Sequence, residues 1–123
     1  MSRPVPDTTK ASIHSLLKER WSPRAFLDIE PAEGVLRELF EGANSSASCF
    51  NEQPWRFAVA RKSNREQWER MLGILAEKNR QWAQSAPVLG FSAGKKTFTH
   101  NGAPNRFGIH DAGMALATMM IAA

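Results

Sequence analysis

The sequence has one cysteine, no targeting segment and no long hydrophobic run, and each absence excludes a class of protein. Cys49 is the only cysteine among 123 residues, so no disulfide can form within the chain and a reducing compartment is compatible. The first ten residues, MSRPVPDTTK, lack the apolar core of a secretory signal peptide. The longest apolar-rich stretch, residues 112–123, is shorter than the roughly 20 residues that span a bilayer. We therefore expect a cytoplasmic protein without a membrane segment.

Several motifs of known chemistry are also missing. The three histidines, His14, His100 and His110, show no metal-binding spacing, and no Cys-x-x-Cys is present, so we expect no metal site. No Gly-x-Ser-x-Gly and no P-loop occurs, and the glycines are too scattered for a dinucleotide fingerprint. The net charge is +4, which would suit an anionic partner, but no run of five basic residues exists. Because acids separate the bases, a mixed and solvated surface is the default expectation.

What is present fits at most one domain with a modest core, at 42% hydrophobic and 23% charged residues. Residues 1–10 contain two prolines and predict a flexible arm. Hydrophobic periodicity predicts the following helices and strands along the rest of the chain. The helices are expected over residues 11–20, 31–44, 63–76 (continuing or restarting to 84) and 108–123, and the strands over 55–60 and 88–92. Ser63 and Glu66 have the spacing of a capping box at the start of the third helix.

The last predicted helix, residues 108–123, is apolar on nearly every face. Such a helix must be buried on all sides, but three amphipathic helices and two short strands cannot cover it. Two separated strands also do not make an independently stable sheet. We therefore expect the fold to be completed by further residues of a longer protein or by another chain.

The segment after the first helix combines two guanidinium groups and a hydroxyl. Pro23 favours an extended chain, in which Arg20, Ser22 and Arg24 project to the same side. Forked, charged donors beside a hydroxyl suit a phosphate monoester. Alternatively, Arg20 neutralises the end of the helix and Arg24 lies in solvent.

A second group of polar residues includes Ser48 and Asn51. Neutral donors and acceptors of this kind can form hydrogen bonds with the polar edge of a ring or with a sugar. Alternatively, they form a turn in which they bond only to the backbone. Asn79 continues the apolar stripe of the third helix, where it needs a buried partner, or it bonds nearby backbone at the helix end. Nothing basic lies beside Cys49 in the sequence, which favours a buried or incidental thiol over a nucleophile.

The chain resembles the nitroreductase family of FMN-dependent oxidoreductases in three stretches, RWSPRAF, SCFNEQPWRF and NRQWAQSAPVL. The resemblance covers nearly the whole chain from Ala11 onward. It implies an α+β fold, a three-layer α/β/α sandwich with a central, mainly antiparallel sheet and a long buried helix at the dimer interface. Family members continue past that helix, so residues 11–123 would form a partial domain that lacks the C-terminal part.

The resemblance also implies binding residues. Arg20, Trp21, Ser22 and Arg24 would lie at the FMN phosphate and ribityl chain. Ser48 and Asn51 would approach the flavin ring of the partner subunit, and Asn79 would touch its polar edge. Gln53 and Trp55 match the family pattern but would serve structure.

The implied activity is a ping-pong transfer of hydride from NAD(P)H through FMN to a nitroaromatic, a quinone or a similar acceptor. The implied assembly is a homodimer with flavin sites at the interface. The flavin carries the chemistry in this scheme, so no side chain is predicted to be catalytic. One alternative is a truncated or degenerate relative that dimerises or binds flavin without turnover. A more remote alternative is a small basic nucleic-acid-binding domain.

Overall fold

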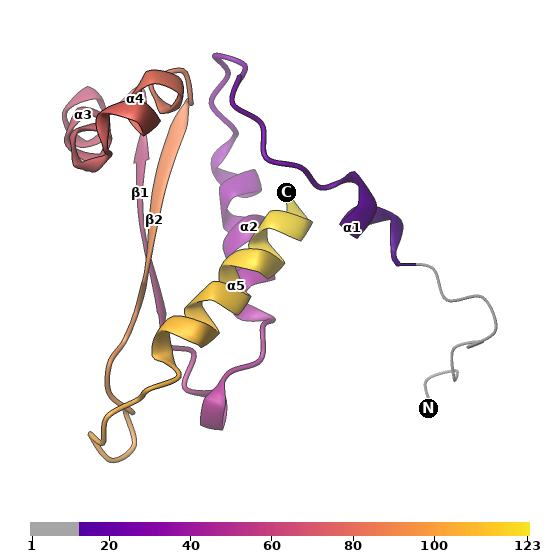
Figure 1. Cartoon of the computed structure of the whole chain (residues 1–123), viewed down its shortest axis with the longest axis vertical. Helices are drawn as coiled ribbons and strands as arrows, with labels where there is room; N and C mark the ends of the chain where they lie inside the picture. Colours follow the sequence, from indigo (N-terminus) through magenta and orange to yellow (C-terminus); the bar gives the residue numbers. More distant parts are fainter. Residues whose placement is uncertain (1–12) are drawn as a thin grey trace.

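The computed structural model describes residues 13–123, in which helices and two strands follow one another along the chain (Figure 1). The helices are α1 (Ser15–Glu19), α2 (Glu33–Asn44), α3 (Arg65–Ile74), α4 (Glu77–Ala83) and α5 (Gly108–Ala122). The strands are β1 (Trp55–Arg61) and β2 (Val88–Gly94), and Cys49–Asn51 forms one 3-10 turn. The arm predicted over residues 1–10 lies outside the described residues.

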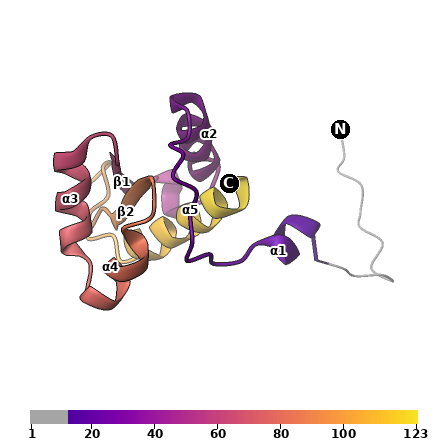
Figure 2. The same cartoon turned by 90° about the horizontal axis from the view of Figure 1, so that it is seen from above.

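The two strands form an antiparallel pair, with Trp55 opposite Gly94 and Arg61 opposite Val88. The expectation of two separated strands is therefore wrong, because β2 returns alongside β1 over its full length. Figure 2 shows α3 and α4 on one side of the strands and α2 and α5 on the other. This arrangement confirms the predicted α+β class with helices on both sides of an antiparallel sheet.

The core lies where α2 and α5 pack against the start of β1. Ala43 of α2, Ala112 and Ala115 of α5, and Trp55 of β1 are buried together. The small alanine side chains let the two helix backbones approach closely, and the Trp55 ring fills the remaining space. The Trp55 indole N–H donates a 2.8 Å hydrogen bond to Asn44 Oδ1, so the polar atom of this buried side chain is satisfied.

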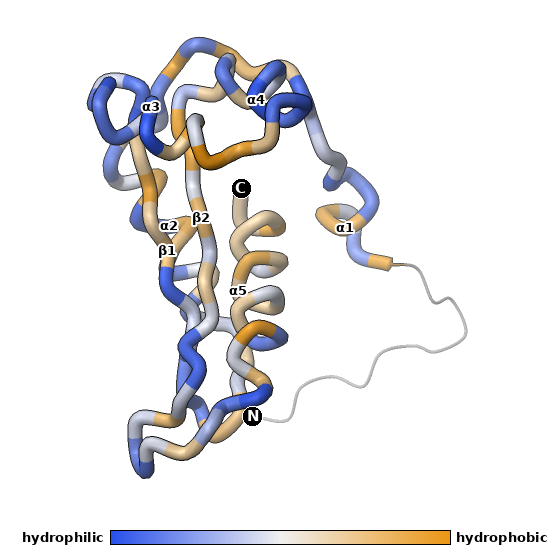
Figure 3. Tube along the Cα trace, turned by 60° about the vertical axis from the view of Figure 1, so that its left-hand side comes forward, coloured by the Kyte–Doolittle hydropathy of each residue, from blue (hydrophilic) through white to orange (hydrophobic). Residues whose placement is uncertain are grey.

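Within residues 13–123, only one face of α5 is covered. Asp111, Ala112 and Ala115 are buried, whereas Ile109 is 76% exposed and Met120 is 48% exposed. Figure 3 shows that most of the helix beyond its first turn is apolar. The part of the chain that the structure describes therefore leaves some of this apolar helix uncovered.

A second apolar surface is concave. An open apolar cavity of about 520 Å³ lies between α2, α4, α5 and the sheet. Its lining includes Phe26, Leu39, Phe40, Phe57, Trp82 and Met119.

The start of α3 differs from the prediction. Asn64, not Ser63, is the N-cap, and its Oδ1 accepts a 3.4 Å hydrogen bond from the Gln67 amide. The amide and hydroxyl of Ser63 instead donate to the Glu30 carboxylate. The predicted capping box with Glu66 is wrong because a distant carboxylate competes for Ser63 and ties α3 to the segment before α2.

The first helix is short and stands apart from the layers in Figures 1 and 2. It begins at Ser15, with His14 Nδ1 accepting a 3.3 Å hydrogen bond from the Leu16 amide. The described part of the chain therefore starts this helix later than the predicted Ala11, which itself lies outside that part. Within residues 13–123, no helix combines the length and the apolar character needed to cross a membrane.

Candidate functional site

The residues after α1 form an exposed, extended strip. The backbone leaves the helix at Arg20, whose φ and ψ of −63° and 127° are extended. Arg20 Nη1 lies 3.4 Å from Ser22 Oγ, so these two side chains share a side, as the alternation predicts. Trp21 is 73% exposed, and Arg24 is also exposed. The strip thus offers two positive charges and a hydroxyl to a ligand from solvent.

The loop from Ser48 to Gln53 has an unusual backbone. Phe50, Asn51 and Gln53 have φ values of 54°, 52° and 49°. This left-handed region costs a residue with a side chain roughly 1–2 kcal/mol, although asparagine tolerates it better. Such a conformation persists only where the surrounding contacts enforce it.

Two contacts fix the first part of this loop. Ser48 Oγ accepts a 2.9 Å hydrogen bond from the Gln53 amide and so closes the loop on itself. The Cys49 amide donates a 3.0 Å hydrogen bond to Oδ2 of Asp111, a buried residue in the first turn of α5. The backbone role considered for Ser48 is therefore present, while Asn51 lies exposed at the turn.

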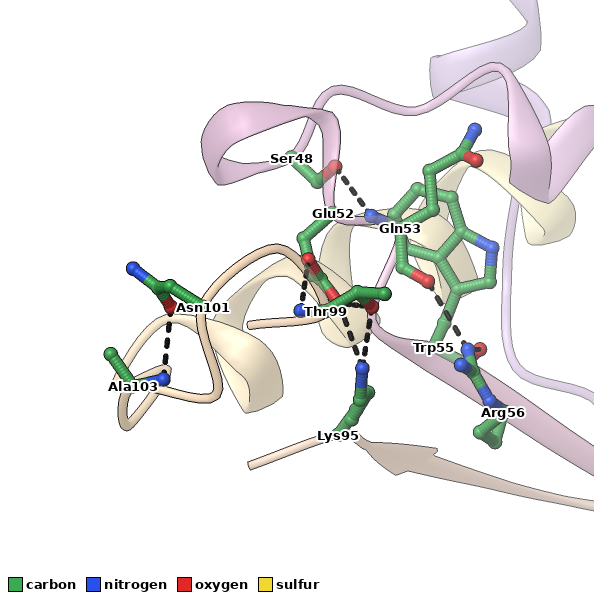
Figure 4. A network of polar contacts seen from close by, with 9 residues as sticks. All are labelled: Ser48, Glu52, Gln53, Trp55, Arg56, Lys95, Thr99, Asn101 and Ala103. Carbon is green, nitrogen blue, oxygen red and sulfur yellow. Dashed lines mark hydrogen bonds and ion pairs between the residues drawn. The ribbon is translucent and has the colours of Figure 1, made fainter. Parts of the chain in front are cut away.

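A third contact holds the second part of the loop, and Figure 4 shows it in detail. The Glu52 side chain is only 4% exposed, and its two oxygens accept the Thr99 amide at 3.0 and 2.9 Å. The Thr99 hydroxyl and the Lys95 ammonium, at 3.1 Å from Oε1, complete the set of donors. Hydrogen bonds from the hydroxyl and then the amide of Thr99, with the charge of Lys95, lower the pKa of Glu52 to about 2.

Sequence reasoning missed Glu52, Thr99 and Asp111. The Glu52–Thr99 contact spans 47 residues and the Cys49–Asp111 contact spans 62, so no local spacing reveals either. The only local signal was a carboxylate between two polar residues of the family motif.

Asn79 does not lie on a buried face. It is an exposed residue near the beginning of α4, and its amide donates to the Ala76 carbonyl. Of the two alternatives for Asn79, the buried position is wrong, because α3 ends at Ile74 and the chain restarts as a new helix at Glu77. The break rotates the second helix, so the apolar stripe of α3 does not continue through Asn79.

The candidate residues form separate groups within one chain. The strip that contains Arg20 and the loop that contains Asn51 lie far apart in Figure 1. The strip continues to Phe26, whose ring lies 6.2 Å from that of Trp82 on the same helix as Asn79. Cys49 is half-buried, and residues 13–123 contain no group of three or more His, Cys, Asp or Glu side chains placed to hold a metal ion.

The chain is similar to one known family and to several solved structures. The model of the Nitroreductase family matches residues 17–123. A structure described as an oxidoreductase containing FMN has a TM-score of 0.80 and 32% identity, over 97% of this chain and 61% of that one. A protein of Desulfovibrio desulfuricans, described as a nitroreductase in complex with FMN, has a TM-score of 0.70 and 21% identity, over 90% and 63%. A Bacteroides thetaiotaomicron protein, described as an NADH dehydrogenase or NAD(P)H nitroreductase, has a TM-score of 0.70 and 19% identity, over 91% and 62%.

The chain thus spans about three fifths of the length of these structures. No curated protein matches it.

Proposed function

Because the chain belongs to the nitroreductase family, we propose that it contributes to an FMN-dependent oxidoreductase. In this proposal NAD(P)H is the reductant, a nitroaromatic, quinone or similar small molecule is the acceptor, and turnover is ping-pong. Bound FMN supplies the redox chemistry, and the protein supplies position and charge. The similar structure at 32% identity, described as containing FMN, supports the choice of cofactor.

The observation that carries the proposal is the alignment of Arg20 with Ser22 on an exposed, extended segment. A guanidinium and a hydroxyl on one side, with Arg24 two residues further, provide forked and charged donors. This donor set fits the FMN phosphate, which carries up to two negative charges. Trp21 lies between them in the sequence and is assigned to the same side of the cofactor.

We assign the remaining residues to the binding of the flavin ring. Asn51 is exposed on the strained loop, and Ser48 shapes that loop through the Gln53 amide. Asn79 is exposed on α4, where a ligand can reach its side-chain amide. We assign this side chain to the polar edge of the flavin.

We propose that the active form is a homodimer whose flavin sites lie at the subunit interface. The strip at Arg20 and the loop at Asn51 lie apart in one chain, so a second copy is needed to bring such groups together. The exposed apolar residues Ile109 and Met120 of α5 suit the core of an interface. We also propose a cytoplasmic location, with which the single cysteine is consistent.

The direct test is the visible spectrum of the purified chain titrated with FMN. We expect flavin bands that shift on binding, and oxidation of NADH or NADPH when a quinone is added. Flavin bands that stay at the positions of free FMN at every FMN concentration would contradict the proposal.

The phosphate assignment has its own test. Changing Arg20→Ala together with Arg24→Ala should weaken FMN binding at least about 100-fold, because each of the two lost charged hydrogen bonds contributes about 1.5–3 kcal/mol. The matched control is Arg65→Ala with Arg70→Ala on α3, which removes the same net charge from two exposed positions. Equal affinities for the two double variants would refute the assignment.

A second candidate is a relative that dimerises or binds flavin without turnover. The observation that favours it is the separation of the strip at Arg20 from the loop at Asn51, because neither group forms a complete flavin site within the described part of one chain. FMN binding without NAD(P)H oxidation would support this candidate, and steady turnover would exclude it.

A further inference from the structure

We propose that Glu52 is a positioning residue that clamps the loop from Ser48 to Gln53 onto the segment after β2. The residues it grips are Thr99 and Lys95. The role of the clamp in cofactor binding rests on the proposed function, whereas its role in holding the loop does not.

The loop needs an external restraint. Its backbone is left-handed at Phe50, Asn51 and Gln53, which are not glycines. The internal bond between Ser48 Oγ and the Gln53 amide closes the loop but does not orient it against the rest of the chain. Glu52 lies between two of these strained residues and is the one whose side chain reaches across to Thr99.

The geometry of the contact is that of a rigid clamp. Both Glu52 oxygens accept the same Thr99 amide, at 3.0 and 2.9 Å, so the carboxylate cannot rotate without losing a bond. Lys95 is itself fixed, because its amide donates a 2.8 Å hydrogen bond to the Pro54 carbonyl. Its ammonium bridges Glu52 Oε1 and Thr99 Oγ1, at 3.1 and 2.6 Å. The side chain of Glu52 is thus nearly enclosed, and each described donor comes from the segment after β2.

An aromatic contact joins the same two segments. The rings of Phe50 and Phe98 meet edge to face with centroids 5.8 Å apart, and His100 lies 5.7 Å from Phe50. Phe50 is 80% exposed, so this contact is open to water and weak on its own. The enclosed carboxylate is therefore the stronger of the two links.

The Glu52 carboxylate of the clamp is ionised at neutral pH. The pKa of Glu52 is lowered to about 2, so the carboxylate keeps its charge above that value. Because Asn51 is the neighbour of Glu52, a clamped Glu52 also holds the backbone from which the exposed Asn51 side chain projects.

The experiment compares Glu52→Ala, Glu52→Gln and Glu38→Ala in the full chain. Glu38 is an exposed glutamate of α2 and serves as the matched control. Amide hydrogen exchange is measured on peptides that cover residues 48–53 and 95–99, and FMN affinity is measured by flavin fluorescence. Far-UV circular dichroism identifies any variant that fails to fold, in which case Lys95→Met provides a milder break of the same clamp.

We expect Glu52→Ala to speed exchange in both peptides by about tenfold or more and to raise the Kd for FMN by a similar factor. Glu52→Gln keeps one acceptor oxygen for the Thr99 amide. Its exchange rates and its Kd for FMN should therefore lie between those of wild type and those of Glu52→Ala. Lys95→Met should give a smaller increase, and Glu38→Ala none.

Exchange in Glu52→Ala that equals wild type in both peptides would overturn the clamp. Faster exchange with unchanged FMN affinity would overturn its positioning role. If wild-type protein binds no FMN, the proposed function fails, but the exchange comparison still decides whether Glu52 holds the loop.

Discussion

Two backbone segments approach closely where β2 ends and α5 begins, and this approach makes Gly108→Ala a sharp test of the packing. A Cβ added at Gly108 would fall well inside contact distance of the Lys95 carbonyl oxygen. The reverse contact is equally tight, because a Cβ at Gly94 would lie 2.6 Å from the Gly108 carbonyl carbon and 2.8 Å from the Ile109 nitrogen. No side-chain rotation relieves these contacts, since the opposing atoms are backbone.

The size of the effect follows from that geometry. Ordinary carbon contacts are about 3.5 Å or longer, so the start of α5 must shift by about 1 Å to accommodate one methyl group. Backbone shifts of this kind cost about 1–3 kcal/mol and occasionally more. We therefore expect Gly108→Ala to lower the free energy of unfolding by about 3 kcal/mol, and the melting temperature by about 10 °C or more. Urea unfolding followed by tryptophan fluorescence measures the first quantity.

The matched control is Gly73→Ala in α3, where an added Cβ meets nothing within 4 Å. Because alanine favours helix, this change should stabilise the chain by about 0.5–1 kcal/mol. Gly94→Ala with Gly108→Ala should cost less than the sum of the single changes, since one outward shift of α5 relieves both contacts. A Gly108→Ala chain within about 0.5 kcal/mol of wild type would refute the reasoning.

Three further predictions concern particular polar side chains. The pKa of Glu52 in the folded chain lies below its ordinary value of 4.5, so the stabilisation by this carboxylate is present above pH 4.5 and is lost as the pH falls towards 2. In an acid titration, the stability of Glu52→Gln should therefore change less over that range than the stability of wild type. Identical curves would contradict this. Asn44→Ala removes the acceptor of the Trp55 indole and should cost about 1 kcal/mol in urea unfolding, whereas Asn44→Asp keeps an acceptor oxygen and should cost less. Raising salt from about 0.05 to 0.5 M should weaken FMN binding to wild type more than to the Arg20→Ala/Arg24→Ala variant, and equal salt dependence in a binding titration would argue against a phosphate contact.

Local patterns predicted much of the secondary structure. The one-sided stripe of residues 31–44 and the apolar run of residues 88–92 correspond to α2 and β2 within two residues at each boundary. Alternation in an extended segment also placed Arg20 and Ser22 on one side. These features depend on neighbours in the sequence, which is why they could be predicted from it.

Contacts between distant segments could not be predicted in this way. Ser63 has a suitable partner three residues later, yet its hydroxyl bonds Glu30, because the folded chain brings that carboxylate closer. Asn79 lies on an exposed face because two residues between α3 and α4 are not helical. Hydrophobic periodicity does not reveal how this break rotates the second helix. Glu52 was missed for the same reason, since Thr99 becomes its partner only after β1 and β2 have paired.

The open apolar cavity beside Phe40 and Trp82 has a consequence for how folding of this chain is monitored. Hydrophobic fluorescent dyes such as ANS are commonly used to detect molten globules, which expose apolar surface after specific packing is lost. This chain offers such surface in its packed state, so the native form should itself enhance dye fluorescence at neutral pH. Near-UV circular dichroism of the buried Trp55 and Trp68 is therefore the appropriate measure of tertiary packing.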